Sequence, residues 1–257
     1  MSLALEQVLL GKRPGLEERA LAFEAIHHQV LDNSRWMKSA DFNTFHANDL
    51  AFMFDRYDSL IFGNAIRDAL GGRPLTFRLS KRQTRSGGQT SWKRKRRVQP
   101  GEPAEEFEIS VSSHLLFQTF RSETREIRVT GLPCENRLQA MQRIVEHEIV
   151  HLSELIVWQQ SGCKKRRFQE IAEGLFGHLE HTHQLVTTRE LAATNHGIRR
   201  GSLVIFQFEG LEYKGVVVKI TKRATVLVPD GRGQLYNDGN RYLKYYVPIS
   251  GLRAIPQ

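Results

Sequence analysis

The sequence has few of the features that mark secreted or membrane-bound proteins. It contains only two cysteines, Cys134 and Cys163, which are too few for a disulfide framework and suit a reducing compartment. No apolar run approaches the length that a membrane-spanning helix needs. Residues 1–6 lack a basic leader followed by a long apolar stretch, so we expect no signal peptide. The sequence also has no internal repeat and no low-complexity tract, and we expect a cytoplasmic protein.

What the sequence does contain is typical of a globular protein with a basic character. The 257 residues are 40% hydrophobic and 25% charged, which allows one substantial core and a smaller module. The formal net charge is +9. This charge favours an acidic partner, with nucleic acid the first candidate, and it would also allow association with the nucleoid.

The segment around residues 143–152 contains the pattern His147-Glu148-Ile149-Val150-His151. Apolar residues recur at helical spacing from Leu138 to Ile156, which predicts a helix that begins near Glu135 or Asn136 and ends near Ser161-Gly162. On a helix, His147 and His151 lie one above the other and can bind one metal ion. Glu148 can then reach a water at the open position of that metal and act as general base. The pattern therefore predicts a hydrolytic Zn²⁺ site.

A catalytic zinc site needs a third protein ligand, and several residues could supply it. Cys163 follows His151 by twelve residues, and a thiolate binds zinc well. Most lone cysteines, however, are only half-buried core residues. The alternatives lie further along the chain, at Glu170, Glu173 and His178. Spacing alone does not choose among these four residues.

The chain divides into a helical start, a mixed centre and a β-rich end. Residues 1 to about 70 carry apolar side chains at helical spacing, and Gly71-Gly72-Arg73-Pro74 ends that pattern. We expect strands at 75–79, 107–111 and 127–129, an exposed hairpin or loop at 81–103, and a helix at 168–179. Four strand runs follow residue 201, with one turn at Pro229-Asp230-Gly231, and predict a small SH3-like β-barrel.

Several of these segments together resemble the SprT/Spartan-like metalloprotease domain. The resemblance covers residues 50 to about 180. It is carried by 54–62 (Phe-Asp-Arg-Tyr-Asp-Ser-Leu-Ile-Phe), the basic region 81–97, residues 109–115, the motif at 147–151 and the segment 161–168. It implies an α+β fold with a zincin-like domain, and proteolysis of proteins on or near DNA.

The resemblance also bears on the third zinc ligand. In that family the third ligand is normally a histidine, shortly beyond the second and just ahead of an aromatic residue that begins the next helix. Cys163, ahead of Phe168, occupies that place. The resemblance therefore implies His147, His151 and Cys163 as ligands of Zn²⁺. A cysteine in place of histidine adds negative charge and makes the zinc less Lewis-acidic.

The same reasoning sets the predicted domain boundaries. We expect a helical segment at 1–48, a SprT-like domain at 49–195 and the small barrel at 196–257. Basic and tyrosine side chains are frequent in the last region, so this region is a candidate nucleic-acid-binding module. A protein-docking module or a stabilising cap would fit it equally.

A basic cluster precedes the predicted metal helix. Between Arg73 and Arg97 the sequence has ten basic residues and no acidic one. Such a cluster binds phosphates without sequence preference, and an aromatic residue within it can stack on an unpaired base. The alternative is a solvated hairpin or a targeting-like signal. The candidate DNA-binding residues are Arg82, Arg85, Trp92, Lys93, Arg94, Lys95, Arg96 and Arg97.

These observations predict a zinc-dependent endopeptidase that acts on a protein substrate on or near DNA, with Glu148 as general base. Two alternatives stay open. The chain could be a non-catalytic nucleic-acid-binding protein with a structural zinc. In that case a fourth protein ligand, such as His178, would occupy the open coordination position. It could also be a peptidase with no link to nucleic acid.

Overall fold

The chain forms two compact units, each with its own hydrophobic core. The computed structural model describes residues 3–99, 101–122, 126–182 and 184–255, and the units are Met1–Leu185 and Val186–Gln257. The predicted α+β class is confirmed. The predicted boundary at 195/196 falls at the end of α8 (Thr188–His196), which belongs to the second unit. None of the described helices is long and apolar enough to cross a membrane.

Helices make up most of the first unit. The predicted helical start is confirmed, and a short π-helical turn at Asp58–Phe62 follows α3 directly. The helix α3 begins at a capping box in which His46 accepts from Asn48 N–H and Asp49 accepts from His46 N–H. The helices of this unit are α1 (Leu3–Gly11), α2 (Leu16–Asn33), α3 (Ala47–Tyr57), α4 (Ala65–Leu70), α5 (Ser113–Ser122), α6 (Arg137–Trp158) and α7 (Arg166–Phe176).

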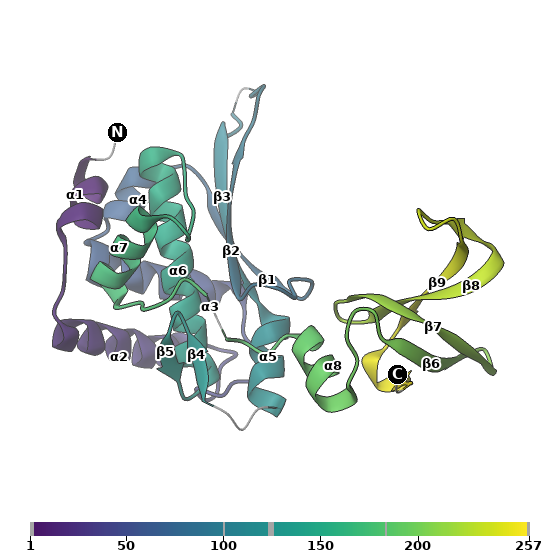
Figure 1. The fold of residues 1–257 in the computed structure, drawn as a ribbon. Coiled ribbons are helices and arrows are strands. Elements are labelled where there is room, and N and C mark those ends of the chain that lie inside the picture. The colour runs from purple at the N-terminus through teal and green to yellow at the C-terminus, as the bar shows by residue number, and fades with distance from the viewer. Residues whose placement is uncertain (1–2, 100, 123–125, 183, 256–257) are drawn as a thin grey trace. The chain divides into compact units, whose positions relative to one another are not determined.

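The first unit contains a three-stranded sheet with the order β1-β3-β2. The strands β1 (Leu75–Ser80) and β3 (Glu105–Ser112) run parallel, and β2 (Gly88–Arg94) pairs antiparallel with β3. The segment predicted as a hairpin or loop thus supplies an edge strand, β2, and its hairpin connection to β3 (Figure 1). A separate hairpin joins β4 (Ile127–Val129) to β5 (Leu132–Cys134).

The long helix α6 lies at the centre of this unit. It packs against β2 and β3 on one side, and α1, α2 and α7 lie on its other side (Figure 1). Asn136 caps its start by accepting from Gln139 N–H at 2.9 Å, as predicted. The helix ends at Trp158, and the left-handed conformation of the next residue, Gln159 (φ 54°), turns the chain two residues before the predicted stop. Because α6 is enclosed on several sides, polar groups on it must find partners inside the protein.

The second unit is a five-stranded antiparallel sheet with α8 and a short 3₁₀ turn (Ile249–Gly251). The sheet order is β10-β6-β7-β8-β9. The predicted turn at residues 229–231 is instead a bulge inside β8, where Pro229 and Gln234 both pair with Tyr242. The strands are β6 (Leu203–Phe208), β7 (Leu211–Ile220), β8 (Ala224–Leu235), β9 (Arg241–Val247) and β10 (Arg253–Ala254).

This sheet does not close into the predicted barrel. Among the described strands, β9 and β10 are the two edges and do not pair with each other. The last strand has only two residues and pairs with β6, which leaves the sheet open. The alternating pattern located the four long strands correctly but carries no information on closure, because closure depends on long-range register.

Candidate metal centre

Three of the predicted site residues meet at one point. His147 and His151 lie on one face of α6, and Cys163 lies in the loop between α6 and α7. One ligand atom from each residue lies within 4.8 Å of the other two, so the cluster could hold a metal ion. Two imidazole nitrogens and one sulfur are a donor set that suits Zn²⁺. All three residues are half-buried, so the cluster is partly accessible to solvent.

An aromatic side chain supports both histidine rings. Phe168, in the first turn of α7, is 1% exposed. Its ring centroid lies 4.8 Å from that of His147 and 4.4 Å from that of His151. Burial lowers the pKa of His151 to about 4, against a smaller opposing effect from Glu154. The imidazole of His151 is therefore neutral at pH 7, which is the form that binds metals.

Glu148 follows His147 on α6 and is held against the sheet. Its side chain points to β2, where Thr90 Oγ1 donates to Glu148 Oε2 at 2.8 Å and lies 3.0 Å from the Glu148 carbonyl oxygen. Glu148 is 4% exposed, and burial raises its pKa to about 7, with the Thr90 hydrogen bonds acting in the opposite direction. A carboxyl group with a pKa near neutrality both accepts and returns a proton readily. Thr90 was not a candidate from the sequence, because only the pairing of β2 beside α6 reveals it.

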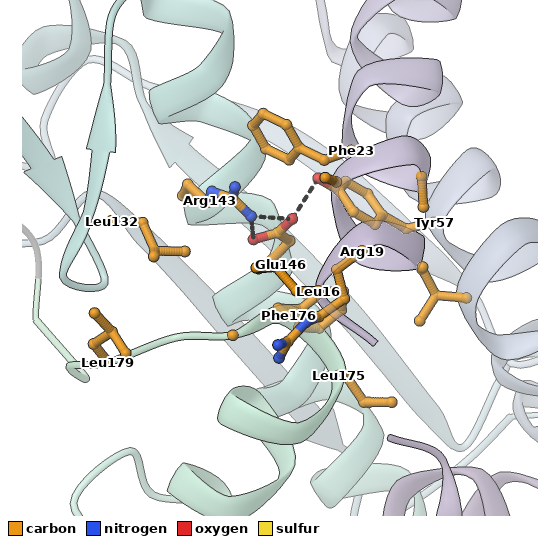
Figure 2. Close-up of a pocket in the computed structure, with 14 residues that line it drawn as sticks. Leu16, Arg19, Phe23, Tyr57, Leu132, Arg143, Glu146, Leu175, Phe176 and Leu179 are labelled. Atoms are coloured by element: carbon orange, nitrogen blue, oxygen red, sulfur yellow. Dashed lines mark hydrogen bonds and ion pairs between the residues drawn. The ribbon is translucent and has the colours of Figure 1, made fainter. Parts of the chain in front are cut away.

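His178, the main rival for third ligand, belongs to a different cluster on another face of α6. Its Nε2 donates to Glu146 Oε2 at 2.9 Å, and the residue is 4% exposed. Arg143 and Tyr57 also bind the Glu146 carboxylate, at 3.0 Å and 2.8 Å (Figure 2). Burial alone would raise the pKa of Glu146, but Arg143 and His178 outweigh it and hold that pKa below its usual value. His178 is thus committed to Glu146 and is not part of the metal cluster.

The two glutamates that were alternatives also lie outside the cluster. Glu170 forms an exposed ion pair with Arg166 at 2.6 Å, one helical turn away on α7. Glu173 is exposed on the same helix. Among the described residues, the one group of three or more histidine, cysteine or acidic side chains that converges on a point is His147, His151 and Cys163.

The structure divides the basic cluster into paired and unpaired residues. Five of the ten form ion pairs with acidic side chains of residues 102–108: Arg73 and Arg94 with Glu105, Arg78 with Glu108, Lys93 with Glu106, and Lys95 with Glu102. The other five are exposed, and no ion pair is recorded for them within the described parts of the chain: Lys81, Arg82, Arg85, Arg96 and Arg97. The stretch considered in the sequence ended at Arg97, so it did not include the acidic residues that pair with half of the basic cluster.

The unpaired basic residues lie at the two ends of β2. Residues 81–85 precede the strand, and residues 96–97 follow it. The seven residues of β2 separate the two groups by roughly 23 Å at about 3.3 Å per residue. Trp92 is not in either group. Its ring stacks on Phe107, with centroids 6.3 Å apart and planes 8° from parallel, and packs against the core.

Comparisons of the chain with protein-family models, with curated proteins and with solved structures gave no match. The resemblance to SprT/Spartan-like proteases therefore stays a prediction from the sequence.

The close approach of β2 to α6 yields a test of the site geometry. A Cβ atom added at Gly88 would lie 2.6 Å from Glu148 Oε1 and 2.7 Å from Ile144 Cγ2. Gly88→Ala should therefore lower the free energy of unfolding by about 1–3 kcal/mol, because the strand or the carboxylate must move. Gly11→Ala is the matched control, since its Cβ meets open space. Urea denaturation measures both variants, and equal stabilities would contradict this packing.

The two cysteines provide a second test. Burial raises the pKa of Cys134 to about 12, so its thiol should resist alkylation at neutral pH. Cys163 is half-buried in its loop and should react first with iodoacetamide. Zn²⁺ should slow alkylation of Cys163, while Mg²⁺, which prefers oxygen ligands, should not. Mass spectrometry of the labelled peptides measures both rates, and a Cys163 rate indifferent to Zn²⁺ would argue against a metal-binding thiolate.

Proposed function

We propose that the chain is a zinc-dependent endopeptidase that acts on proteins on or near DNA, with a zincin-like first unit similar to the SprT/Spartan-like domain. The observation that carries the proposal is the convergence of His147, His151 and Cys163 within 4.8 Å, with the buried Glu148 beside them on α6. A structural zinc would need a fourth protein ligand, and the cluster has three among the described residues.

In this proposal the three cluster residues bind the metal and Glu148 transfers the proton. His147, His151 and Cys163 would hold Zn²⁺, which when bound supplies Lewis acidity and lowers the pKa of a water at its open position. Glu148 takes the proton from the attacking water and passes it to the leaving amine. Thr90 holds this carboxylate against β2 through its hydroxyl and its backbone N–H.

The sheet provides a path for an extended peptide. β2 is an edge strand of the described sheet, and Thr90 joins it to Glu148. Edge strands bind extended peptides by adding them as a further strand. A substrate aligned with β2 would bring an internal peptide bond near Glu148, as an endopeptidase requires.

The proposed DNA contact rests on the unpaired basic residues at the two ends of β2. Lys81, Arg82 and Arg85 precede the strand. Gly87, two residues after Arg85, lies beside Ile144 of the helix that carries the cluster. Phosphates bound there would hold a DNA-associated protein near Glu148. Because this binding is electrostatic, it should be independent of DNA sequence and weaken as salt rises.

Substituting the general base tests the hydrolytic part. Glu148→Gln should retain stoichiometric zinc but reduce peptide cleavage by at least about 100-fold, because the amide cannot accept the proton. Zinc content by mass spectrometry and cleavage of a DNA-bound protein substrate measure the two properties. Normal cleavage by this variant would refute the assigned mechanism. Strong DNA binding with zinc present and no cleavage by the wild type would favour the structural-zinc alternative.

The division of the basic cluster into paired and unpaired residues allows a test of the proposed DNA binding. Arg96→Gln/Arg97→Gln should weaken binding to a short fluorescent duplex and lower the salt slope by about 2, since each lost phosphate contact lowers it by about 0.9. Lys93→Gln/Lys95→Gln removes two charges from the same hairpin that are already paired with Glu106 and Glu102, and it should change the slope less. Anisotropy titrations at several salt concentrations measure both. Equal effects would show that ion pairing does not decide which charges meet DNA.

A further inference from the structure

Ser161 links the second histidine of the cluster to an ion pair between the buried Glu154 and the half-buried Arg167. His151 Nδ1 lies 2.6 Å from Ser161 Oγ, and Ser161 Oγ lies 2.7 Å from Glu154 Oε2. The other oxygen of Glu154 accepts from Arg167 Nε at 2.7 Å. Glu154 is 0% exposed. These four side chains form a continuous chain of hydrogen bonds that ends at the imidazole.

The chemistry of the groups fixes the direction of each hydrogen bond. Arg167 always donates, and the Glu154 carboxylate that is paired with it only accepts. Ser161 has a single hydroxyl proton, which must therefore go to Glu154. Its oxygen can then only accept from His151, so the proton of the neutral imidazole resides on Nδ1. The lone pair of Nε2 is left for another partner.

We infer that Ser161 and Glu154 are positioning residues that hold His151 in its Nδ1–H tautomer and so reserve Nε2 for the metal. The role of this tautomer in metal binding rests on the proposed function. The tautomer itself follows from the hydrogen bonds alone and does not depend on a metal. A ligand histidine held in this way loses less orientational freedom when it binds metal, and its basicity rises. This role is not visible in the sequence, because it depends on contacts between α6 and the loop that follows it.

The same carboxylate also orders the loop that carries the third ligand. Gly162 N–H points to Glu154 Oε2 at 3.4 Å, next to Cys163 in the chain. Arg167 donates to Gln160 O at 3.1 Å and stacks on Trp158, with its guanidinium carbon 4.1 Å from the ring centroid. Glu154 thus fixes the second ligand through Ser161 and restricts the approach of the third through the backbone.

Histidine ¹⁵N chemical shifts in the metal-free protein test the tautomer directly. The wild type should show Nδ1 protonated and Nε2 bare at His151. Ser161→Ala should give a tautomer mixture and lower zinc affinity by about 10–100-fold, measured by competition with a chromophoric chelator. Ser161→Thr keeps the hydroxyl and should restore both properties. The His151 tautomer would not change if Ser161 only stabilised the loop.

Ser153→Ala is the matched control. Ser153 is 0% exposed on α6, beside Glu154, and its hydroxyl has no hydrogen-bond partner among the described residues. This variant should leave both the His151 tautomer and the zinc affinity unchanged. An Nε2–H tautomer in the wild type, or unchanged tautomer and affinity in Ser161→Ala, would overturn the inference. A wild type with the Nδ1–H tautomer but no zinc binding would instead refute the proposed function and leave the tautomer assignment standing.

Discussion

The buried carboxylate of Glu154 is the constraint on which the geometry of the metal cluster depends. It lies on α6 nearly one turn beyond His151, and its partners Ser161, Gly162 and Arg167 all come from the segment after the helix. A buried charge without partners would cost several kcal/mol. The chain avoids this cost by turning back after Gln159, because the turn brings Ser161, Gly162 and Arg167 to the Glu154 carboxylate. The turn places Cys163 next to the two histidines.

The helix α6 shows how environment separates two carboxylates that are two residues apart. At about 100° per residue, Glu146 and Glu148 point to nearly opposite sides. Glu146 accepts hydrogen bonds from Arg143, His178 and Tyr57, and the first two hold its pKa below the usual value. Among the described residues, Thr90 donates hydrogen bonds to Glu148 and no charged side chain is paired with it. Burial therefore dominates and raises the pKa of Glu148 to about 7. One carboxylate is thereby a fixed structural charge and the other a group that can exchange a proton, which is the division that acid–base catalysis needs.

Much of this arrangement could be predicted from local sequence patterns. The start of α6 at Asn136 and the strands at 75–79 and 107–111 follow from capping and periodicity, which act over a few residues. The choice among Cys163, Glu173 and His178 could not be made in this way, because it depends on long-range contacts. His178 is taken by Glu146, 32 residues earlier. Likewise, the acids of β3 that pair with the basic cluster are identified only by the register of β3 with both of its neighbours, β1 and β2.

The charges around the cluster determine how strongly a metal there would act. His151 is neutral at pH 7, and Arg167 balances Glu154. The Cys163 thiolate would then be the one ligand charge, leaving about +1 on the site with a divalent ion. A site with three histidines would keep about +2 and polarise water more strongly. In the proposed peptidase, the smaller positive charge would make proton transfer by Glu148 more important. Burial raises the pKa of Glu148 to about 7, which is the range in which a carboxyl group can serve as general base.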